Sequence, residues 1–378
     1  MISPNRSMED APGSPGQPLN HSTMMHRCLE LAAKGAGRTS PNPMVGSVIV
    51  KDGQIVGEGF HPQVGQPHAE VFALRAAGDK AQGATLYVNL EPCNHTGRTP
   101  PCTEAVLQAG IATVVIGMAD PNPQASGGIE RLRAAGVTVI TDVETAACEQ
   151  LNEAFIHRIR HRQPFSILKY AMTLDGKIAT DTGHSTWITS PESRRRVHQL
   201  RGQCDAVIVG GNTVRRDNPH LTSHGVCDHN PWRVVMSRSL DLPTTANLWQ
   251  TDIAPTLVFT ETPPENASAI SQPTLPSQVE IVPLNPLTPA AVLNNLYGRG
   301  ASTVLWECGG TLAAAALGEG VIQKLWAFIA PKLIGGNKGY TPVGDMGLKT
   351  MTEALMLQKT ELEKIGQDWL IQAYLAND

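Results

Sequence analysis

Four residues limit how this 378-residue chain can fold. His68 and Glu70 are followed by Cys93 and then by Cys102. A zinc ion that activates water uses three protein ligands and keeps one position open, and one imidazole with two thiolates provides this set with little net charge. We therefore expect His68, Cys93 and Cys102 to bind Zn²⁺, and the fold must bring their three segments to one point.

Glu70 is expected to act beside the metal without binding it. It lies two residues beyond His68, at the start of a predicted helix, so its carboxylate can reach a water molecule on the metal. It can take a proton from that water and deliver it to a leaving nitrogen. The order His-x-Glu, Pro-Cys and Cys resembles the signature of zinc-dependent nucleobase deaminases. Two residues separate the cysteines in that signature, whereas eight residues separate them here.

Two other interpretations of these residues stay open. His68 can be a helix-capping histidine with both cysteines as packing residues, which we disfavour because three ligand types and a carboxylate follow one another within residues 68–102. A closed structural zinc site needs a fourth ligand, and His95 is the candidate.

The remaining cysteines and the absence of long apolar runs indicate a reducing compartment. Seven cysteines, an odd number, do not suggest a disulfide framework. No apolar run approaches the ~20 residues of a membrane span, and the first residues lack the apolar core of a signal peptide. We expect a cytoplasmic protein without a membrane partner, in which the other cysteines pack as small hydrophobic residues: Cys28, Cys148, Cys204, Cys227 and Cys308.

The charge balance argues against a nucleic-acid partner. Lys and Arg number 30 against 34 Asp and Glu, giving a net charge of −4, and no basic stripe is visible. Nucleic-acid binding depends on such positive charge. Composition does not decide whether the chain forms a homo-oligomer.

The apolar pattern predicts two α/β domains. Residues 1–20 are rich in Ser, Pro and Gly and are expected to form a mobile tail. Strands and helices alternate over residues 21–145, and residues 146–163 are expected to form one connecting helix that Pro164 ends. A second alternating pattern fills residues 164–378, where we interpret the proline-rich residues 263–289 as an extended loop region inside the same domain.

Long strings in the first domain resemble one enzyme family. They are Ser40 to Gly46, Gly59 to His61, Glu91 to Cys102 and Asp120 to Pro123, and they resemble the bifunctional deaminase/reductase of riboflavin biosynthesis. The resemblance implies a cytidine-deaminase-like fold, with His68, Cys93 and Cys102 as zinc ligands and Glu70 as the proton shuttle. It also implies a substrate pocket lined by Asn42, His61, Arg98, Asp120 and Asn122.

The substrate assignments have a plain alternative. Asn42 and Asn122 each lie between two prolines, a setting that also suits turn residues.

The second domain contains two glycine pairs that each follow an apolar strand and precede a helix. Gly210 with Gly211 and Gly309 with Gly310 would let backbone amides approach a phosphate, although ordinary structural turns look the same.

Longer strings extend the family resemblance through this domain. Residues 169–179, 185–190, 210–213 and 330–336 are similar to the reductase half of the same family, which has a dihydrofolate-reductase-like fold. The resemblance implies that NADPH contacts Ala171, Trp187, Thr213, Asp217, Gly309, Gly310, Thr311 and Leu312. It implies that substrate contacts Ser185, Arg201, Leu221, His224 and Glu307.

Two positions depart from the family pattern. The family has Arg where this chain has His224, and Asp where it has Ser237. Arg can hold a phosphate at any pH, whereas His carries the needed charge only when protonated. Arg238 is a candidate for the cofactor 2′-phosphate, with a solvated loop arginine as the alternative, and we expect Arg194, Arg195 and Arg196 to form a solvated helix face.

The resemblance implies two consecutive reactions. The first domain would deaminate 2,5-diamino-6-(5-phosphoribosylamino)pyrimidin-4(3H)-one, and the second would reduce the ribosyl group of the product with NADPH. One rival is a reductase with an inactive zinc domain, which the complete set of ligands and Glu70 disfavours. The other is a deaminase that edits nucleic acid, which the negative net charge disfavours.

Overall fold

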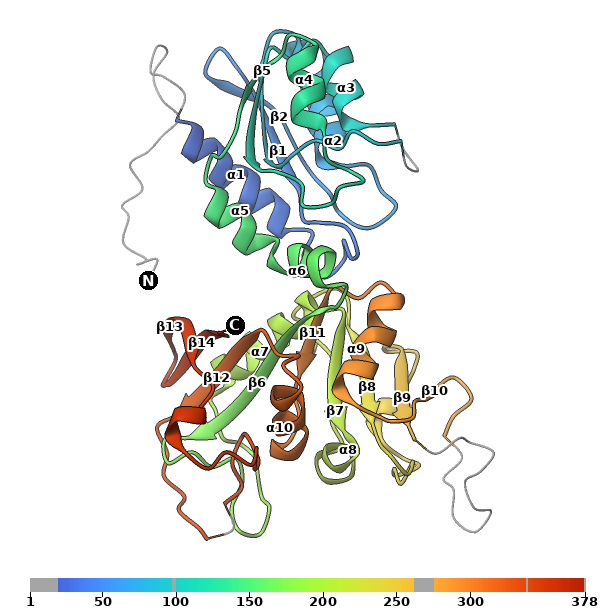
Figure 1. Cartoon of the computed structure of the whole chain (residues 1–378), viewed down its shortest axis with the longest axis vertical. Helices are drawn as coiled ribbons and strands as arrows, with labels where there is room; N and C mark the ends of the chain where they lie inside the picture. The colour runs from blue at the N-terminus through green and yellow to red at the C-terminus, as the bar shows by residue number, and fades with distance from the viewer. Residues whose placement is uncertain (1–19, 97–99, 262–274, 338, 377–378) are drawn as a thin grey trace. The chain divides into compact units, whose positions relative to one another are not determined.

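The computed structural model describes residues 20–96, 100–261, 275–337 and 339–376 (Figure 1). The chain forms two compact units, residues 2–162 and 163–378. Arg98 and the expected mobile tail, apart from its last residue, lie outside the described residues. None of the helices in the described ranges combines the length and the apolar character that a membrane crossing requires.

A five-stranded mixed sheet forms the centre of residues 2–162. The first strand along the chain pairs antiparallel with both of its neighbours, and the last three strands along the chain run parallel to one another. The order is β2 (Gln54–Phe60), β1 (Gly46–Lys51), β3 (Thr85–Leu90), β4 (Thr113–Met118) and β5 (Thr138–Ile140).

Helices cover both faces of this sheet. One side carries α1 (His21–Ala33) and α5 (Thr145–Leu151), and the other carries α2 (Ala69–Ala77), α3 (Cys102–Gln108) and α4 (Gly128–Ala134), with a 3₁₀ turn at Gly78–Ala81 (Figure 1). Coverage on both sides explains why β1, β3 and β4 are runs of consecutive buried residues rather than alternating ones.

The single connecting helix predicted for residues 146–163 is wrong. Two helices, α5 and α6 (Glu153–His161), meet at Asn152, whose backbone has φ −101° and ψ 19°. The buried Asn152 side chain accepts a hydrogen bond from the Met44 N–H at 2.8 Å and donates one to the Met44 carbonyl at 3.0 Å. The helix is interrupted where this side chain satisfies buried backbone groups that lie far away in sequence.

Residues 163–378 are built on a nine-stranded sheet. The first seven strands in spatial order run parallel to one another, and each of the last two pairs antiparallel with the strand before it. The order is β10 (Glu280–Pro283), β9 (Thr256–Thr260), β8 (Trp232–Met236), β7 (Ala206–Gly210), β11 (Thr303–Trp306), β6 (Phe165–Thr173), β12 (Lys324–Ala330), β14 (Asp368–Leu375) and β13 (Leu357–Ile365).

The helices of this unit are α7 (Pro191–Gln203), α8 (Gly211–Asp217), α9 (Pro289–Gly298) and α10 (Gly310–Gly318), with 3₁₀ turns at Asn247–Trp249 and Met351–Glu353. The prolines of residues 263–289 predict an extended loop and give no sign of α9. Pro289 instead occupies the first helical turn, where its missing N–H costs nothing, and Thr288 accepts a hydrogen bond from the Ala291 N–H at 3.2 Å.

Strand order creates a functional edge in this sheet. The chain adds β7 to β10 outward in one direction and then inserts β11 between β7 and β6. Trp306, the last residue of β11, pairs with Leu168 of β6 and Ile208 of β7. Residues that follow these positions therefore gather at the carboxyl ends of parallel strands, where open α/β sheets bind ligands.

Gly202 allows a loop to approach α7 at this edge. A Cβ atom at Gly202 would lie 2.4 Å from the Sγ atom and 2.6 Å from the Cβ atom of Cys227. The loop around residues 221–227 can therefore pack against α7, and the Thr222 carbonyl accepts a hydrogen bond from Arg201 at 3.1 Å.

We predict that Gly202→Ala lowers the free energy of unfolding by about 1–3 kcal/mol, the usual cost of overpacking. Gly318→Ala is the matched control, because Gly318 is also helical and has open space around its Cβ position. There alanine should leave stability unchanged or raise it by up to about 1 kcal/mol. Denaturant titration of both variants checks the difference, and equal stabilities would contradict the close approach.

Candidate active sites

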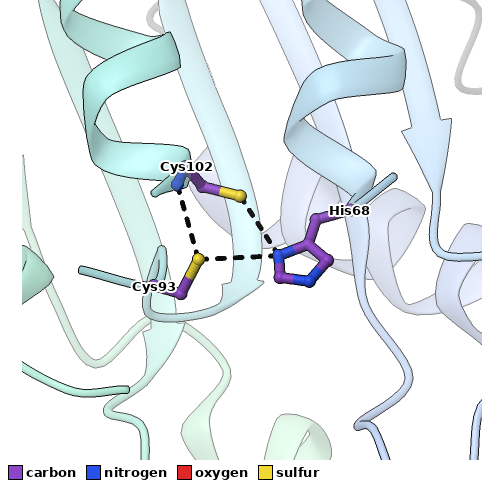
Figure 2. Close-up of side chains that lie close together, drawn as sticks. All are labelled: His68, Cys93 and Cys102. Carbon is purple, nitrogen blue, oxygen red and sulfur yellow. Dashed lines mark hydrogen bonds between the residues drawn. The ribbon is translucent and has the colours of Figure 1, made fainter. Parts of the chain in front are cut away.

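His68, Cys93 and Cys102 converge in residues 2–162 (Figure 2). His68 caps the N-terminus of α2, Cys93 follows β3, and Cys102 begins α3. The His68 Nδ1 atom lies 3.2 Å from the Cys102 Sγ atom and 3.5 Å from the Cys93 Sγ atom. The Cys102 N–H points at the Cys93 sulfur, at 3.4 Å.

This donor set fits zinc. Atoms bonded at about 2.0–2.3 Å to one tetrahedral ion lie about 3.5 Å apart, which is the spacing found here. Hydrogen bonds from Cys102 and His68 lower the pKa of the Cys93 thiol, so a thiolate is available as a ligand. His95 is exposed and is not part of the three-residue group, so within the described residues the site has the open position of a catalytic centre.

Glu70 lies beside this group in the first turn of α2 and is only 3% exposed. Among the described residues, its Oε2 atom has no hydrogen-bond partner. Burial raises the pKa of the Glu70 carboxyl, and the positive charge of His68 opposes this rise. A buried carboxyl with a free oxygen next to a metal site is suited to exchange protons with a ligand there.

His61 and Asn42 form a hydrogen-bonded pair next to His68. The His61 Nδ1 atom lies 3.0 Å from the Pro67 carbonyl, so it carries the proton, and the Nε2 atom accepts a hydrogen bond from the Asn42 amide at 3.1 Å. Burial lowers the pKa of His61, which keeps the ring neutral. The His61 and His68 rings meet edge to face at 5.6 Å.

Asp120 and Asn122 follow β4 in a tight turn. The Asp120 Oδ1 atom accepts a hydrogen bond from the Asn122 N–H at 2.8 Å, and the Asn122 side chain accepts one from the Gln124 N–H at 3.1 Å. The Asn122 amide therefore also serves the turn, as its sequence setting allowed. Burial raises the pKa of Asp120 to about 6, and the nearby Glu91 and Cys93 add to this rise.

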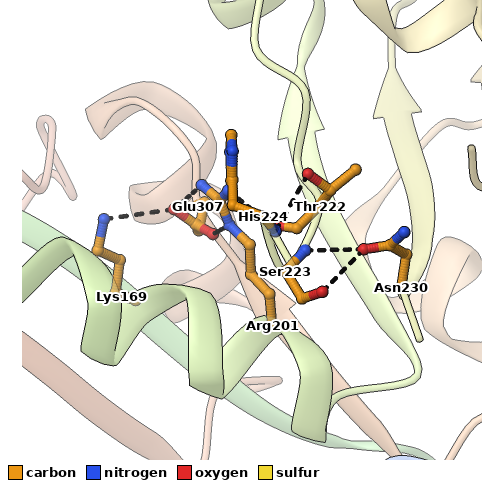
Figure 3. Close-up of polar contacts among 7 residues, drawn as sticks. All are labelled: Lys169, Arg201, Thr222, Ser223, His224, Asn230 and Glu307. Atoms are coloured by element: carbon orange, nitrogen blue, oxygen red, sulfur yellow. Dashed lines mark hydrogen bonds and ion pairs between the residues drawn. The ribbon is translucent and has the colours of Figure 1, made fainter. Parts of the chain in front are cut away.

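In residues 163–378, a buried ion cluster forms at the carboxyl edge of the sheet (Figure 3). Glu307 follows β11, and its carboxylate contacts the Arg201 guanidinium with both oxygens and the Lys169 ammonium at 3.3 Å. Burial alone would raise the pKa of Glu307, but Arg201 and Lys169 outweigh it and lower the value to about 2. Arg201 and Glu307, both expected to contact substrate, are thus each other's partners.

Three histidine rings meet beside this cluster. The His224 ring stacks on the His198 ring with centroids 4.2 Å apart, and His220 contacts it edge to face at 6.0 Å. Burial, Arg201 and His220 lower the pKa of His224. Leu221, the neighbouring substrate prediction, is only 2% exposed.

Trp187, one of the expected NADPH residues, is 67% exposed. The Arg194 guanidinium lies 4.3 Å from the centre of its ring, and the Lys332 ammonium donates hydrogen bonds to the carbonyls of Trp187 and Ile188. Arg194 thus has a partner, unlike the solvated arginine we expected. The tryptophan is held from two sides and presents an aromatic face.

The other cofactor candidates lie on several elements. Ala171 is in β6, and Thr213 and Asp217 are in α8. Burial raises the pKa of Asp217, and the nearby Arg216 and Ser185 oppose this rise, so a substrate prediction lies close to a cofactor prediction.

The second glycine pair begins a helix. Gly309 caps α10, which continues through Gly310, Thr311 and Leu312.

The residues that follow β8 are tightly packed at Ser237 and exposed at Arg238. The Arg238 guanidinium lies 3.9 Å from the Glu261 carboxylate. A Cβ atom on Gly211 would lie 3.1 Å from the Ser237 hydroxyl oxygen, so these two positions have room only for small residues.

Four residues were missed by the sequence analysis: Lys169, His198, Lys332 and Glu91. A charged residue inside the apolar strand β6 was the available signal for Lys169. The other three interact with residues far along the chain, and no local pattern indicates such partners.

Comparison with protein families agrees with this division. Residues 18–118 match the model of the cytidine and deoxycytidylate deaminase zinc-binding region, which includes all three metal-site residues. Residues 164–371 match the model of the RibD C-terminal domain.

Similar proteins cover nearly the whole chain. The riboflavin biosynthesis protein RibD of Synechocystis is 59% identical over 95% of this chain and 98% of its own, and that of Escherichia coli is 41% identical over 91% and 96%. The solved diaminohydroxyphosphoribosylaminopyrimidine deaminase/5-amino-6-(5-phosphoribosylamino)uracil reductase of Thermotoga maritima superposes with a TM-score of 0.86 at 39% identity, over 94% of this chain and 99% of that one. The chain belongs to the RibD family of riboflavin biosynthesis, and it joins a zinc-dependent deaminase to an NADPH-dependent reductase.

Proposed function

We propose that residues 21–145 deaminate 2,5-diamino-6-(5-phosphoribosylamino)pyrimidin-4(3H)-one to 5-amino-6-(5-phosphoribosylamino)uracil. Residues 164–378 then reduce the ribosyl group of this product to the ribityl group. The observation that carries the proposal is the presence in one chain of a three-ligand zinc site with a buried free carboxylate oxygen and of a separate buried cationic cluster.

In the first reaction, Glu70 moves protons between water and the pyrimidine. Zinc, when bound by His68, Cys93 and Cys102, supplies a Lewis acid that polarises a water molecule. Glu70 accepts one proton as the water oxygen bonds to the ring carbon that carries the 2-amino group, and it passes this proton to the adjacent ring nitrogen. It then takes the second proton from the new hydroxyl group and delivers it to the 2-amino nitrogen. The carbon–nitrogen bond then breaks, and ammonia and the uracil carbonyl form.

The pyrimidine is oriented by the groups around the metal site. We assign Asn42, His61, Asp120 and Asn122 to this role, together with Arg98 from outside the described residues. The fixed His61 tautomer and its bond to the Asn42 amide support the assignment, because they leave Asn42 with its carbonyl oxygen available to a ligand.

In the second reaction, the ion cluster binds the phosphorylated sugar. NADPH, when bound, would supply a hydride to C1 of the ribosyl group, and the sugar oxygen released from C1 would take a proton. Glu307 stays ionised at neutral pH and can accept hydrogen bonds from sugar hydroxyls. Lys169 and Arg201 add positive charge that suits a phosphate ester.

The remaining assignments of this reductase are also proposals. NADPH contacts Ala171, Trp187, Thr213, Asp217, Arg238 and residues 309–312, and substrate contacts Ser185, Leu221 and His224. We propose a cytoplasmic location, which the free thiols of all seven cysteines support.

Glu70→Gln should retain zinc and lose deamination by at least about a hundredfold, because the amide cannot carry the proton. Reduction of the already deaminated compound should stay unchanged. Glu30→Gln, which changes an exposed glutamate in the same unit, is the control and should behave as wild type. Metal analysis and an ammonia-release assay check both variants, and zinc loss in parallel with activity would show that Glu70 is a ligand.

His224 should make the reductase sensitive to pH. Its pKa is lowered in the free protein, so the ring is neutral at pH 7 and contributes a full charge to phosphate binding only in acid. Bound phosphate favours the charged ring and raises this pKa, and the contribution is lost as pH rises through the raised value. The Michaelis constant for the sugar phosphate should therefore rise from mildly acidic to mildly alkaline pH.

His224→Arg should flatten this profile and lower the Michaelis constant at alkaline pH by about tenfold, because arginine stays charged. The arginine variant also reports the ionisation of the substrate phosphate itself, which affects both proteins equally. Deaminase activity should not change. Parallel profiles for the two proteins would remove His224 from the phosphate site.

A further inference from the structure

Glu91 is a buried carboxylate next to the metal site that no step of the reaction uses. It follows β3, two residues before Cys93, and is 5% exposed. Glutamate is almost never buried to this degree unless its charge has partners. The partners of Glu91 therefore show what the residue does.

Within the part of the chain that the structure describes, the carboxylate has three hydrogen-bond partners, and they are backbone N–H groups of one segment. The Oε2 atom accepts a hydrogen bond from the Asp120 N–H at 3.0 Å. The Oε1 atom accepts from the Gly127 N–H at 2.9 Å and from the Ile129 N–H at 3.1 Å. One carboxylate thus holds both ends of residues 120–129, which we call the 120–129 segment, through bonds that its charge strengthens.

Other contacts attach the middle of the 120–129 segment to the metal loop. The Asn94 N–H donates to the Ala125 carbonyl at 3.0 Å, and the Asn94 side chain accepts from the Thr103 hydroxyl at 3.1 Å. A Cβ atom on Gly128 would lie 2.0 Å from the Pro92 carbonyl oxygen, so the two backbones are in direct contact. The segment and the ligand-bearing loop pack as one body.

The 120–129 segment contains Asp120 and Asn122, which are proposed to contact the pyrimidine. Of the metal-site residues, Cys93 and Cys102 lie between Glu91 and this segment in the chain, and His68 precedes Glu91. Glu91 is close in sequence to Cys93, and its carboxylate is bonded to the segment that is proposed to hold the substrate. It therefore connects the metal site with the substrate-binding part of the pocket.

We propose that Glu91 is a positioning residue of the deaminase. It holds the 120–129 segment at the distance from the metal at which Asp120 and Asn122 can orient the pyrimidine. This inference rests on the proposed deaminase function. It assigns to Glu91 an effect on substrate binding rather than on metal binding or proton transfer.

The chemistry requires a carboxylate at this position. Three N–H groups need acceptor lone pairs on two oxygens, and glutamine offers only one oxygen. Its NH₂ group would face an N–H donor, so at least one bond is lost and two donors oppose each other. Glu91→Gln therefore loosens the segment without changing the size of the side chain.

We expect zinc-loaded Glu91→Gln to raise the Michaelis constant for deamination by about tenfold. The turnover number should change by less than about twofold, because Glu70 and the ligands are untouched. Zinc content and reductase activity should equal those of wild type. Hydrogen exchange should become faster in a peptide covering residues 119–130 and stay unchanged in β3.

Glu104→Gln is the matched control. Glu104 lies on α3 in the same unit, and its carboxylate pairs with Arg131, a residue beyond the 120–129 segment, at 2.8 Å. It should leave the Michaelis constant and the exchange pattern unchanged.

Two results would overturn the inference. An unchanged Michaelis constant in the Gln variant is one. Zinc loss or misfolding in step with lost turnover is the other, because Glu91 would then support the fold or the metal. Failure of the zinc-loaded wild-type protein to release ammonia would instead overturn the proposed function, and wild type and variant would then be equally inactive.

Discussion

Charge placed at the carboxyl ends of parallel strands is the constraint on which both sites depend. In the first unit, Glu91 follows β3 and Asp120 follows the parallel strand β4. In the second, Glu307 follows β11 and lies next to Lys169 of the parallel strand β6. Parallel strands place these residues at one edge, where buried charge must find partners or ligands.

The two sites meet this constraint in different ways. Glu307 is neutralised by two cations, so its charge is fixed and stays available to a hydroxyl-rich ligand. At Glu70, burial raises the pKa of the carboxyl, and the positive charge of His68 only opposes this rise. A carboxylate that stays ionised suits binding, whereas one with a raised pKa suits proton transfer. The difference in environment matches the difference between reduction, where the cofactor carries the hydride, and hydrolysis.

Local pattern was sufficient to predict most of the strands and the metal site. The ligands lie in short strings whose residue types have few other uses, and buried parallel strands appear as apolar runs. The break at Asn152 was not predictable, because its cause is Met44, 108 residues earlier. Likewise, nothing near Glu91 announces amides that lie 29 to 38 residues away. Helical periodicity also does not report that the His198 ring stacks on His224.

One chain performs two reactions in order, each at its own site. The most direct test of this order is to measure ammonia release and NADPH oxidation together, with the diaminopyrimidine as substrate and with zinc present or removed by a chelator. The zinc-loaded protein should release one ammonia for each NADPH that it oxidises. After zinc removal both signals should vanish with this substrate, while NADPH oxidation with the deaminated compound continues. NADPH oxidation that persists on the diaminopyrimidine without zinc or ammonia release would contradict the account.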